Sequence, residues 1–354
     1  MNEPIKHHYI PQFILRNFNK EGNRVCYWNI ENNKLEEWST SSIFMEKNLY
    51  RNNDYSDEPT KIERKFSQLE NEISQLIKNN ILNREVITLT RAEAFKLRNF
   101  LFLMSFRIRA KMQQYRDQNF TPDTKEYLSS YVKNENYEKL WLEELNNILD
   151  AKSIENVLNA DVDSIMKEQA FSFKSFYYLT FVKTKEQNFL LGDVYPTAEI
   201  DISLINDSPE KTFLHFLYPI TPNLMIILNN VIFKKQYEAI NKSMKDIVDI
   251  DTIIMRSKIK GNCIFEPIPH YAKPNQYSLD DIFEYHLKQI KNSEVLYINS
   301  LILNEAKKGI IFKNKYGIYD SIKYYEALLN IQNSRKNDYR PLLLEILDKN
   351  QKNK

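Results

Sequence analysis

Residues 90–109 read TRAEAFKLRNFLFLMSFRIR, and this stretch decides the fold. Thr90 and Glu93 stand at the spacing of a capping box, in which the side chain of each accepts a hydrogen bond from the backbone N–H of the other. The run from Phe100 to Met104 is apolar at every position, so it offers no polar face to water. The stretch therefore predicts a long helix that begins after Thr90, continues into Arg107, and is buried on all sides in its middle.

Before this stretch, the chain predicts a second long helix and a hairpin. Pro59 stands at a first-turn position, and the chain then carries apolar residues at helical spacing as far as about Asn80. These residues are Ile62, Phe66, Leu69, Ile73, Leu76 and Ile77. Closer to the N-terminus, segments 25–30 and 35–38 flank a polar turn at 31–34, which is typical of a hairpin.

After residue 110, helical and strand patterns follow one another in blocks. We predict helices over 124–150 and 161–174, strands over 177–184, 188–191, 212–218 and 224–228, and then helices near 279–292, 294–308 and 319–332 with a frayed basic tail. No internal repeat and no linker interrupts this order. The predicted fold class is α+β, predominantly helical, with a mainly antiparallel sheet and a small N-terminal hairpin.

Composition limits the class of protein. The 49 basic and 47 acidic residues leave a net charge of +2, so any contact with nucleic acid must be local. No apolar run approaches the ~20 residues that span a bilayer, and the start lacks the apolar segment of a signal peptide. Cys26 and Cys263 lack the spacing of a metal site or of a disulfide framework. These features predict a cytoplasmic protein without a membrane partner.

The segment from His7 to Phe18 reads HHYIPQFILRNF, and it resembles the opening signature of a widespread bacterial family of unknown function, His-His-Tyr-x-Pro-x-x-x-Leu-Arg-x-Phe. Later landmarks of that family follow in the same order: Glu63 and Glu70, Arg107 at the end of an apolar run, Asp193 after a glycine, and Tyr-Pro-Ile-Thr-Pro at 218–222. The chain departs from the family pattern at Met104, where Gln is usual, and in the turn at 192–195.

This resemblance spans roughly residues 7–265 and implies a shared fold and a shared site, but it supplies no reaction. We therefore expect a composite α+β core over 1–265. Residues 266–354 are expected to form a helical C-terminal extension packed on that core.

His7 and His8 are the first candidates for catalysis. Imidazole is a base or metal ligand when neutral and an acid when protonated, and its pKa lies near neutral pH. On a strand the two rings point to opposite faces, so one would enter a site while the other binds a carboxylate or a carbonyl. We favour His8 as the functional one. From the sequence alone, an interpretation of both as polar packing groups is equally supported.

Three carboxylates join this candidate set. Glu63 and Glu70 lie seven residues apart, so they stand nearly above one another at the edge of the apolar stripe of their helix. Asp193 follows Gly192 at a strand end, where it would either project into a site or cap a turn. We predict catalytic roles for all three, against the commoner outcomes of solvated glutamates and a turn-capping aspartate.

Two arginines are the candidates for substrate binding. Arg16 stands between Leu15 and Phe18, so we expect a buried guanidinium paired either with a phosphate or with Glu63 or Glu70. Arg107 leaves the apolar run and is the second candidate. An internal ion pair is the competing interpretation for Arg16. His215, between Leu214 and Phe216, is most simply a hydrogen-bonded core histidine.

Together these residues suit hydrolysis of a phosphodiester, because acids or a divalent metal would activate water, arginine would neutralise charge, and histidine would move the proton. We therefore hypothesise a phosphodiesterase or nuclease-like hydrolase acting on nucleic acid or nucleotide, in bacterial defence or as a toxin effector. The alternative is a non-catalytic sensor that binds a phosphate or a partner segment. A third interpretation is a structural subunit of a larger complex. No HExxH, GxSxG, P-loop or GxGxxG motif occurs.

Overall fold

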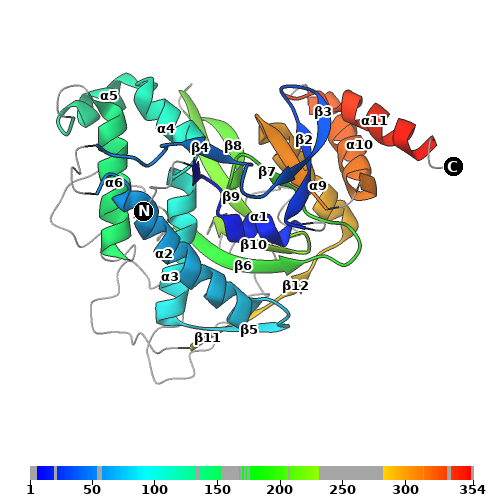
Figure 1. Cartoon of the computed structure of the whole chain (residues 1–354), viewed down its shortest axis with the longest axis horizontal. Helices are drawn as coiled ribbons and strands as arrows, with labels where there is room; N and C mark the ends of the chain where they lie inside the picture. Colours follow the sequence, from blue (N-terminus) through cyan, green and yellow to red (C-terminus); the bar gives the residue numbers. More distant parts are fainter. Residues whose placement is uncertain are drawn as a thin grey trace. The chain divides into compact units, whose positions relative to one another are not determined.

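The computed structural model describes residues 6–19, 22–53, 58–132, 136–152, 167, 170, 173, 176–205, 208–230, 282–313, 315–332 and 336–351. It has a mixed α+β fold with several mostly antiparallel sheets (Figure 1), as the sequence predicted. The chain forms two compact units. Unit 1 contains Met1–Tyr9, Met45–Tyr177 and Ile254–Glu284, and unit 2 contains Ile10–Phe44, Tyr178–Ile253 and Tyr285–Lys354. The boundary expected at residue 265 lies outside the described residues.

Unit 1 is built around the helix that residues 90–109 predict. Its elements are β1 (Lys6–His8), β4 (Met45–Lys47), α2 (Lys61–Leu76), a π-helical turn (Ile77–Ile81), β5 (Val86–Thr90), α3 (Arg91–Phe106), α4 (Arg109–Arg116), α5 (Pro122–Ser129) and α6 (Tyr137–Ala151). The helices α2 and α3 pack side by side (Figure 1), and α2 also contacts α6. Strands β1 and β4 pair antiparallel, and β5 pairs with β11 (Ile282–His286), whose first residues belong to this unit.

Helix α3 confirms the prediction in detail. The Thr90 hydroxyl accepts from the Glu93 N–H, and the Glu93 carboxylate accepts from the Thr90 N–H at 2.7 Å, so the capping box is complete. Every residue from Phe100 to Met104 is buried. A helix that is apolar all round must be surrounded by protein, so α3 is the core element of unit 1.

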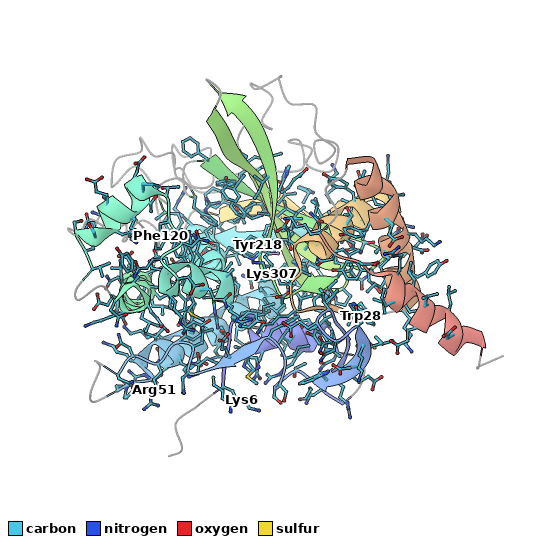
Figure 2. All side chains as sticks on the ribbon, turned by 90° about the horizontal axis from the view of Figure 1, so that it is seen from above. Lys6, Trp28, Arg51, Phe120, Tyr218 and Lys307 are labelled. Atoms are coloured by element: carbon cyan, nitrogen blue, oxygen red, sulfur yellow. The ribbon has the colours of Figure 1, made fainter. Side chains whose placement is uncertain are left out.

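Unit 2 combines two sheets with helices. Its elements are α1 (Gln12–Asn17), β2 (Arg24–Asn29), β3 (Lys34–Ser39), β6 (Tyr177–Lys183), β7 (Leu191–Gly192), β8 (Thr197–Ile205), β9 (Ser208–Thr221), β10 (Leu224–Asn230), β12 (Lys288–Gln289), α9 (Asn292–Glu305), β13 (Gly309–Phe312), α10 (Lys315–Gln332) and α11 (Arg340–Gln351). The sheet orders are β12-β6-β10-β9-β8 and β3-β2-β13-β7. Figure 2 shows the β8–β9 hairpin extending beyond the other strands of its sheet.

The core of unit 2 lies between these sheets and the C-terminal helices. One buried cluster joins Trp28 of β2, Met225 of β10, Ile302 of α9, Ile322 of α10 and Leu342 of α11. The predicted hairpin is confirmed as β2 and β3, in which Asn29 pairs with Lys34 across the turn. The last helix, α11, replaces much of the predicted frayed tail, because it packs against α10 and β3.

The helix predicted near 279–292 is wrong over its described part. Residues 282–286 and 288–289 form the strands β11 and β12 instead. Phe283 and Tyr285 are buried while their neighbours are more exposed, which is the two-residue alternation of a strand. The helix predicted at 161–174 falls largely outside the described residues. Among the helices that the structure describes, none is long and apolar enough to cross a membrane.

Gly309 of β13 gives a test of this packing. A Cβ atom at Gly309 would lie 2.2 Å from the ring of Tyr27, whose hydroxyl donates to the Lys308 carbonyl at 3.0 Å. Overpacking of this kind costs about 1–3 kcal/mol, so Gly309→Ala should lower the free energy of unfolding by that amount. The control is Gly317→Ala in α10, where the nearest atom to a new Cβ is at 3.6 Å. Alanine favours a helix, so urea titration should show unchanged or higher stability there.

Candidate functional site

Arg107 is the centre of the candidate site. It caps the C-terminus of α3, and only 1% of the residue is exposed. Its guanidinium donates to three segments of unit 1: Nη1 to Glu70 Oε1 of α2 at 2.5 Å, Nη2 to the carbonyl oxygen of His8 in β1, and Nε to the Tyr50 hydroxyl at 3.2 Å. We call His7, His8, Tyr50, Glu63, Glu70 and Arg107 the Arg107 cluster.

Aromatic rings surround this guanidinium. The Cζ atom of Arg107 lies 4.1 Å from the centroid of the Phe66 ring and 5.4 Å from that of Tyr50. Rings attract a cation through their faces while they exclude water. Burial by itself lowers the pKa of Arg107, but Tyr50, Glu70 and Glu63 raise it above its ordinary value. Arg107 is therefore a permanent positive charge inside unit 1.

His7 is held by a hydrogen bond from the backbone. Its Nδ1 accepts a hydrogen bond of 2.9 Å from the Tyr50 N–H, so that nitrogen carries no proton and a neutral ring carries it on Nε2. The ring stacks on Tyr50 with 5.6 Å between centroids, and the residue is fully buried. His7 thus anchors β1 to the loop after β4. His8, also buried, uses its carbonyl oxygen to bind Arg107.

Glu63 differs from the other members of the cluster. The pKa of Glu63 is raised from 4.5 to about 7, because burial raises it more than the positive charge of Arg107 lowers it, and the negative charge of Glu70 adds a smaller rise. Among the described residues, no group donates a hydrogen bond to Glu63 Oε2. Glu70, in contrast, is bound directly to Arg107. In the cluster, Glu70 is therefore a carboxylate paired with a cation, whereas Glu63 is a carboxyl group whose pKa lies near neutral pH.

The structure brings five of the predicted residues together in unit 1, namely His7, His8, Glu63, Glu70 and Arg107. Figure 2 labels Lys6 and Arg51, which neighbour His7 and Tyr50 in the chain and lie at the lower edge of that view. Arg16 and Asp193 belong to unit 2. Their predicted roles in substrate binding and catalysis stay predictions.

The expectation that Arg16 is buried is wrong. Arg16 is exposed on α1, and its Nη2 donates to Gln12 Oε1 at 2.7 Å. The buried residues of the helix are Ile14 and Leu15. Glu70, named as one partner for Arg16, binds Arg107 instead.

Asp193 caps a turn in unit 2. Its Oδ1 accepts from the backbone N–H of Lys307 at 2.7 Å and from that of Gly309 at 3.5 Å. Burial raises the pKa of Asp193, and the backbone hydrogen bonds oppose the rise. The carboxylate therefore stabilises the loop between α9 and β13 through hydrogen bonds. This is the turn-capping role that the sequence left open for Asp193.

The sequence did not indicate Tyr50, and it did not indicate that Glu199 and Tyr297 form a polar group with His215 in unit 2. There the His215 Nδ1 lies 2.8 Å from Glu199 Oε2, and the Tyr297 hydroxyl donates to Glu199 Oε1 at 2.7 Å. His215 is fully buried, so its interpretation as a hydrogen-bonded core histidine is confirmed. Neither Tyr50 nor Glu199 stands in a motif. Their roles depend on partners that are distant in sequence.

Within the described ranges, no group of three or more His, Cys, Asp or Glu side chains is arranged to hold a metal ion. In the Arg107 cluster, Glu70 and His7 Nδ1 are both occupied by hydrogen bonds.

Comparison with known proteins identifies a family. The model of a family described as "Protein of unknown function (DUF4238)" matches residues 6–316. No curated protein and no solved structure matches the chain. The family match confirms the resemblance inferred from residues 7–18.

Two arginine substitutions test the assignment of the buried charge. Arg107→Ala would leave Glu70 and the His8 carbonyl without their donor, and breaking a buried ion pair costs about 3–5 kcal/mol. Arg16→Ala removes an exposed side chain, so its effect should stay within about 0.5 kcal/mol. Urea titration of both variants measures the contrast. Equal losses of stability in the two would show that Arg107 is not the central charge.

Glu63 gives a prediction for the pH dependence of stability. Because its pKa is raised from 4.5 to about 7 in the folded protein, the folded state binds more protons than the unfolded state between these values. The contribution of Glu63 is fully present below pH 4.5 and is lost as pH rises through 7. Glu63→Gln should therefore gain stability relative to the wild type between pH 5 and 8, by on the order of 1 kcal/mol after solvent screening. Parallel stability curves in urea over that range would refute the assignment.

Proposed function

The chain belongs to the family of unknown function DUF4238, and from this premise we propose that it is a hydrolase of the phosphodiesterase or nuclease kind that acts on nucleic acid or nucleotide. The proposed general base is Glu63. Glu70 and Arg107 form an ion pair beside it. His8 is the proposed second proton carrier.

The proposal depends on one observation, the state of Glu63. A general base is most effective when its pKa lies near the working pH, and burial, offset in part by Arg107, leaves the pKa of Glu63 at about 7. One of its carboxylate oxygens has no hydrogen-bond donor among the described residues, so it is available to accept a proton. A carboxylate with a perturbed pKa and a specific charged neighbour is a recognised mark of a functional site.

In the proposed reaction, Glu63 takes a proton from water as the water oxygen forms a bond to phosphorus. The bond from phosphorus to the leaving oxygen then breaks, and a proton is returned to that oxygen. Arg107 does not reach the phosphate in this scheme, because all three of its nitrogens are engaged. Its part is to hold Glu70 and to keep the ionised form of Glu63 accessible near neutral pH.

The alternative is a non-catalytic protein that senses a phosphate or a partner segment. It is favoured by the engagement of Arg107 and of His7 Nδ1 in internal hydrogen bonds, which is the pattern of residues that stabilise a fold. The two proposals differ at Glu63, because a sensor needs no group that exchanges a proton near pH 7.

A cleavage assay distinguishes these proposals. Purified protein is incubated with RNA, DNA and nucleotides, with Mg²⁺, Mn²⁺ or Zn²⁺ and with a chelator. Loss of a general base lowers the rate about 10²–10⁴-fold, so Glu63→Gln should lose activity by that factor. The matched control is Glu72→Gln on the same helix, since Glu72 is exposed and pairs with Lys96. It should retain wild-type activity.

The pH profile adds a second readout. Because a general base acts in its ionised form, kcat/KM of the wild type should rise with pH through about 7, the pKa of Glu63. His8→Ala should also reduce the rate without loss of fold. Equal activity of all variants, or none over the whole panel, would favour the sensor.

A further inference from the structure

Tyr50 lies at the meeting point of the Arg107 cluster. It follows β4 and is fully buried. Its hydroxyl group interacts with Arg107 twice, because it donates to the Arg107 carbonyl oxygen at 3.0 Å and accepts from Arg107 Nε at 3.2 Å. Its backbone N–H donates to His7 Nδ1 at 2.9 Å. One residue thus binds the main chain and the side chain of Arg107 as well as the anchoring histidine.

The carbonyl contact has a clear role at the end of α3. The last carbonyl groups of a helix have no partner within the helix. Arg107 is the C-cap of α3, and the Tyr50 hydroxyl satisfies its carbonyl oxygen. The ring of Tyr50 is in turn held by Phe66 and Trp141, with centroids at 5.0 Å and 5.9 Å. The hydroxyl is therefore held on a rigid support.

We propose that Tyr50 is the positioning residue of this site: its hydroxyl holds Arg107 Nε so that the guanidinium stays on Glu70 and does not turn to Glu63. The catalytic meaning of this role rests on the proposed function. The geometric part of the proposal concerns only which carboxylate, Glu70 or Glu63, the guanidinium of Arg107 contacts. This can be measured in the protein without substrate.

A buried hydrogen-bond donor such as Arg107 Nε needs an acceptor. If the Tyr50 hydroxyl is removed, Arg107 Nε loses this acceptor, and a buried donor without an acceptor is unfavourable. Among the described residues, Glu63 Oε2 is a nearby acceptor without a donor. The guanidinium should then turn towards Glu63. A closer positive charge favours the ionised carboxylate, so the pKa of Glu63 should fall.

The variant that tests this is Tyr50→Phe, which removes the hydroxyl and keeps the ring. Its matched control is Tyr115→Phe, since Tyr115 is also a buried tyrosine of unit 1 but stands on α4. Glutamate side chains are labelled with ¹³C, and the Glu63 signal is assigned by its loss in Glu63→Gln. The midpoint of the Glu63 titration is then compared in the three proteins.

We expect the Glu63 midpoint to fall by about one pH unit or more in Tyr50→Phe, as for a carboxylate that gains a close cation. Tyr115→Phe should leave it unchanged. If Tyr50→Phe does not fold, 3-fluorotyrosine at position 50 keeps the packing and weakens the oxygen as an acceptor, so the midpoint should shift in the same direction by less. An unshifted midpoint in a folded Tyr50 variant overturns the proposal, because the hydroxyl would then be only a structural contact.

Activity separates this inference from the proposed function. In an active enzyme, Tyr50→Phe should move the rising limb of kcat/KM to lower pH by the same amount as the Glu63 midpoint. A shifted midpoint in a protein that cleaves nothing would support the positioning role and refute the hydrolase. Cleavage by the wild type with an identical pH profile in Tyr50→Phe would refute the positioning role and retain the hydrolase.

Discussion

The burial of one guanidinium is the constraint on which the arrangement of unit 1 depends. A charge that is removed from water needs several hydrogen bonds and an opposite charge, or its burial is strongly unfavourable. Arg107 obtains these from β1, from Tyr50 in the loop after β4, and from α2. These segments are far apart in sequence, so the charge defines where they meet. The position of Glu63 beside this charge follows from the same arrangement.

The sequence predicts those elements whose signals are local. The capping box at Thr90 and the apolar run from Phe100 to Met104 locate α3, because both depend on residues within one helix. The hairpin of β2 and β3 follows from its turn for the same reason. The sequence predicts a helix over 282–286, where the structure has a strand, because a short apolar pattern fits both the 3.6-residue period of a helix and the two-residue period of a strand. The strand is stabilised there by burial of Phe283 and Tyr285, which its own sequence does not reveal.

The candidate site also contains some residues that the sequence indicates and others that it does not. The family resemblance singles out Arg107 and Glu70, two polar residues that stand beside apolar ones in their helices, and the structure pairs them. The same reasoning failed for Arg16, since a helix turns by about 100° per residue and places Arg16 about 200° from the buried Ile14. Apolar neighbours in sequence are therefore not apolar neighbours in space. Tyr50 gave no signal, because a tyrosine in a loop has no periodicity to depart from.

The Glu199 group of unit 2 and the Arg107 cluster of unit 1 differ in how fully their carboxylates are hydrogen-bonded. Glu199 is satisfied on both oxygens, by His215 across the hairpin and by Tyr297 of α9. The pair is also a register pair of β8 and β9, so a slip by one residue would move Glu199 to the other face and separate them. Both oxygens of that carboxylate thus bind partners within unit 2, one in the sheet and one on α9. In the Arg107 cluster two carboxylates stand beside one cation: Glu70 forms the ion pair with Arg107, and Glu63 Oε2 has no hydrogen-bond partner among the described residues. A buried group left over in this way destabilises the fold when it ionises, because its charge is removed from water without a partner of its own.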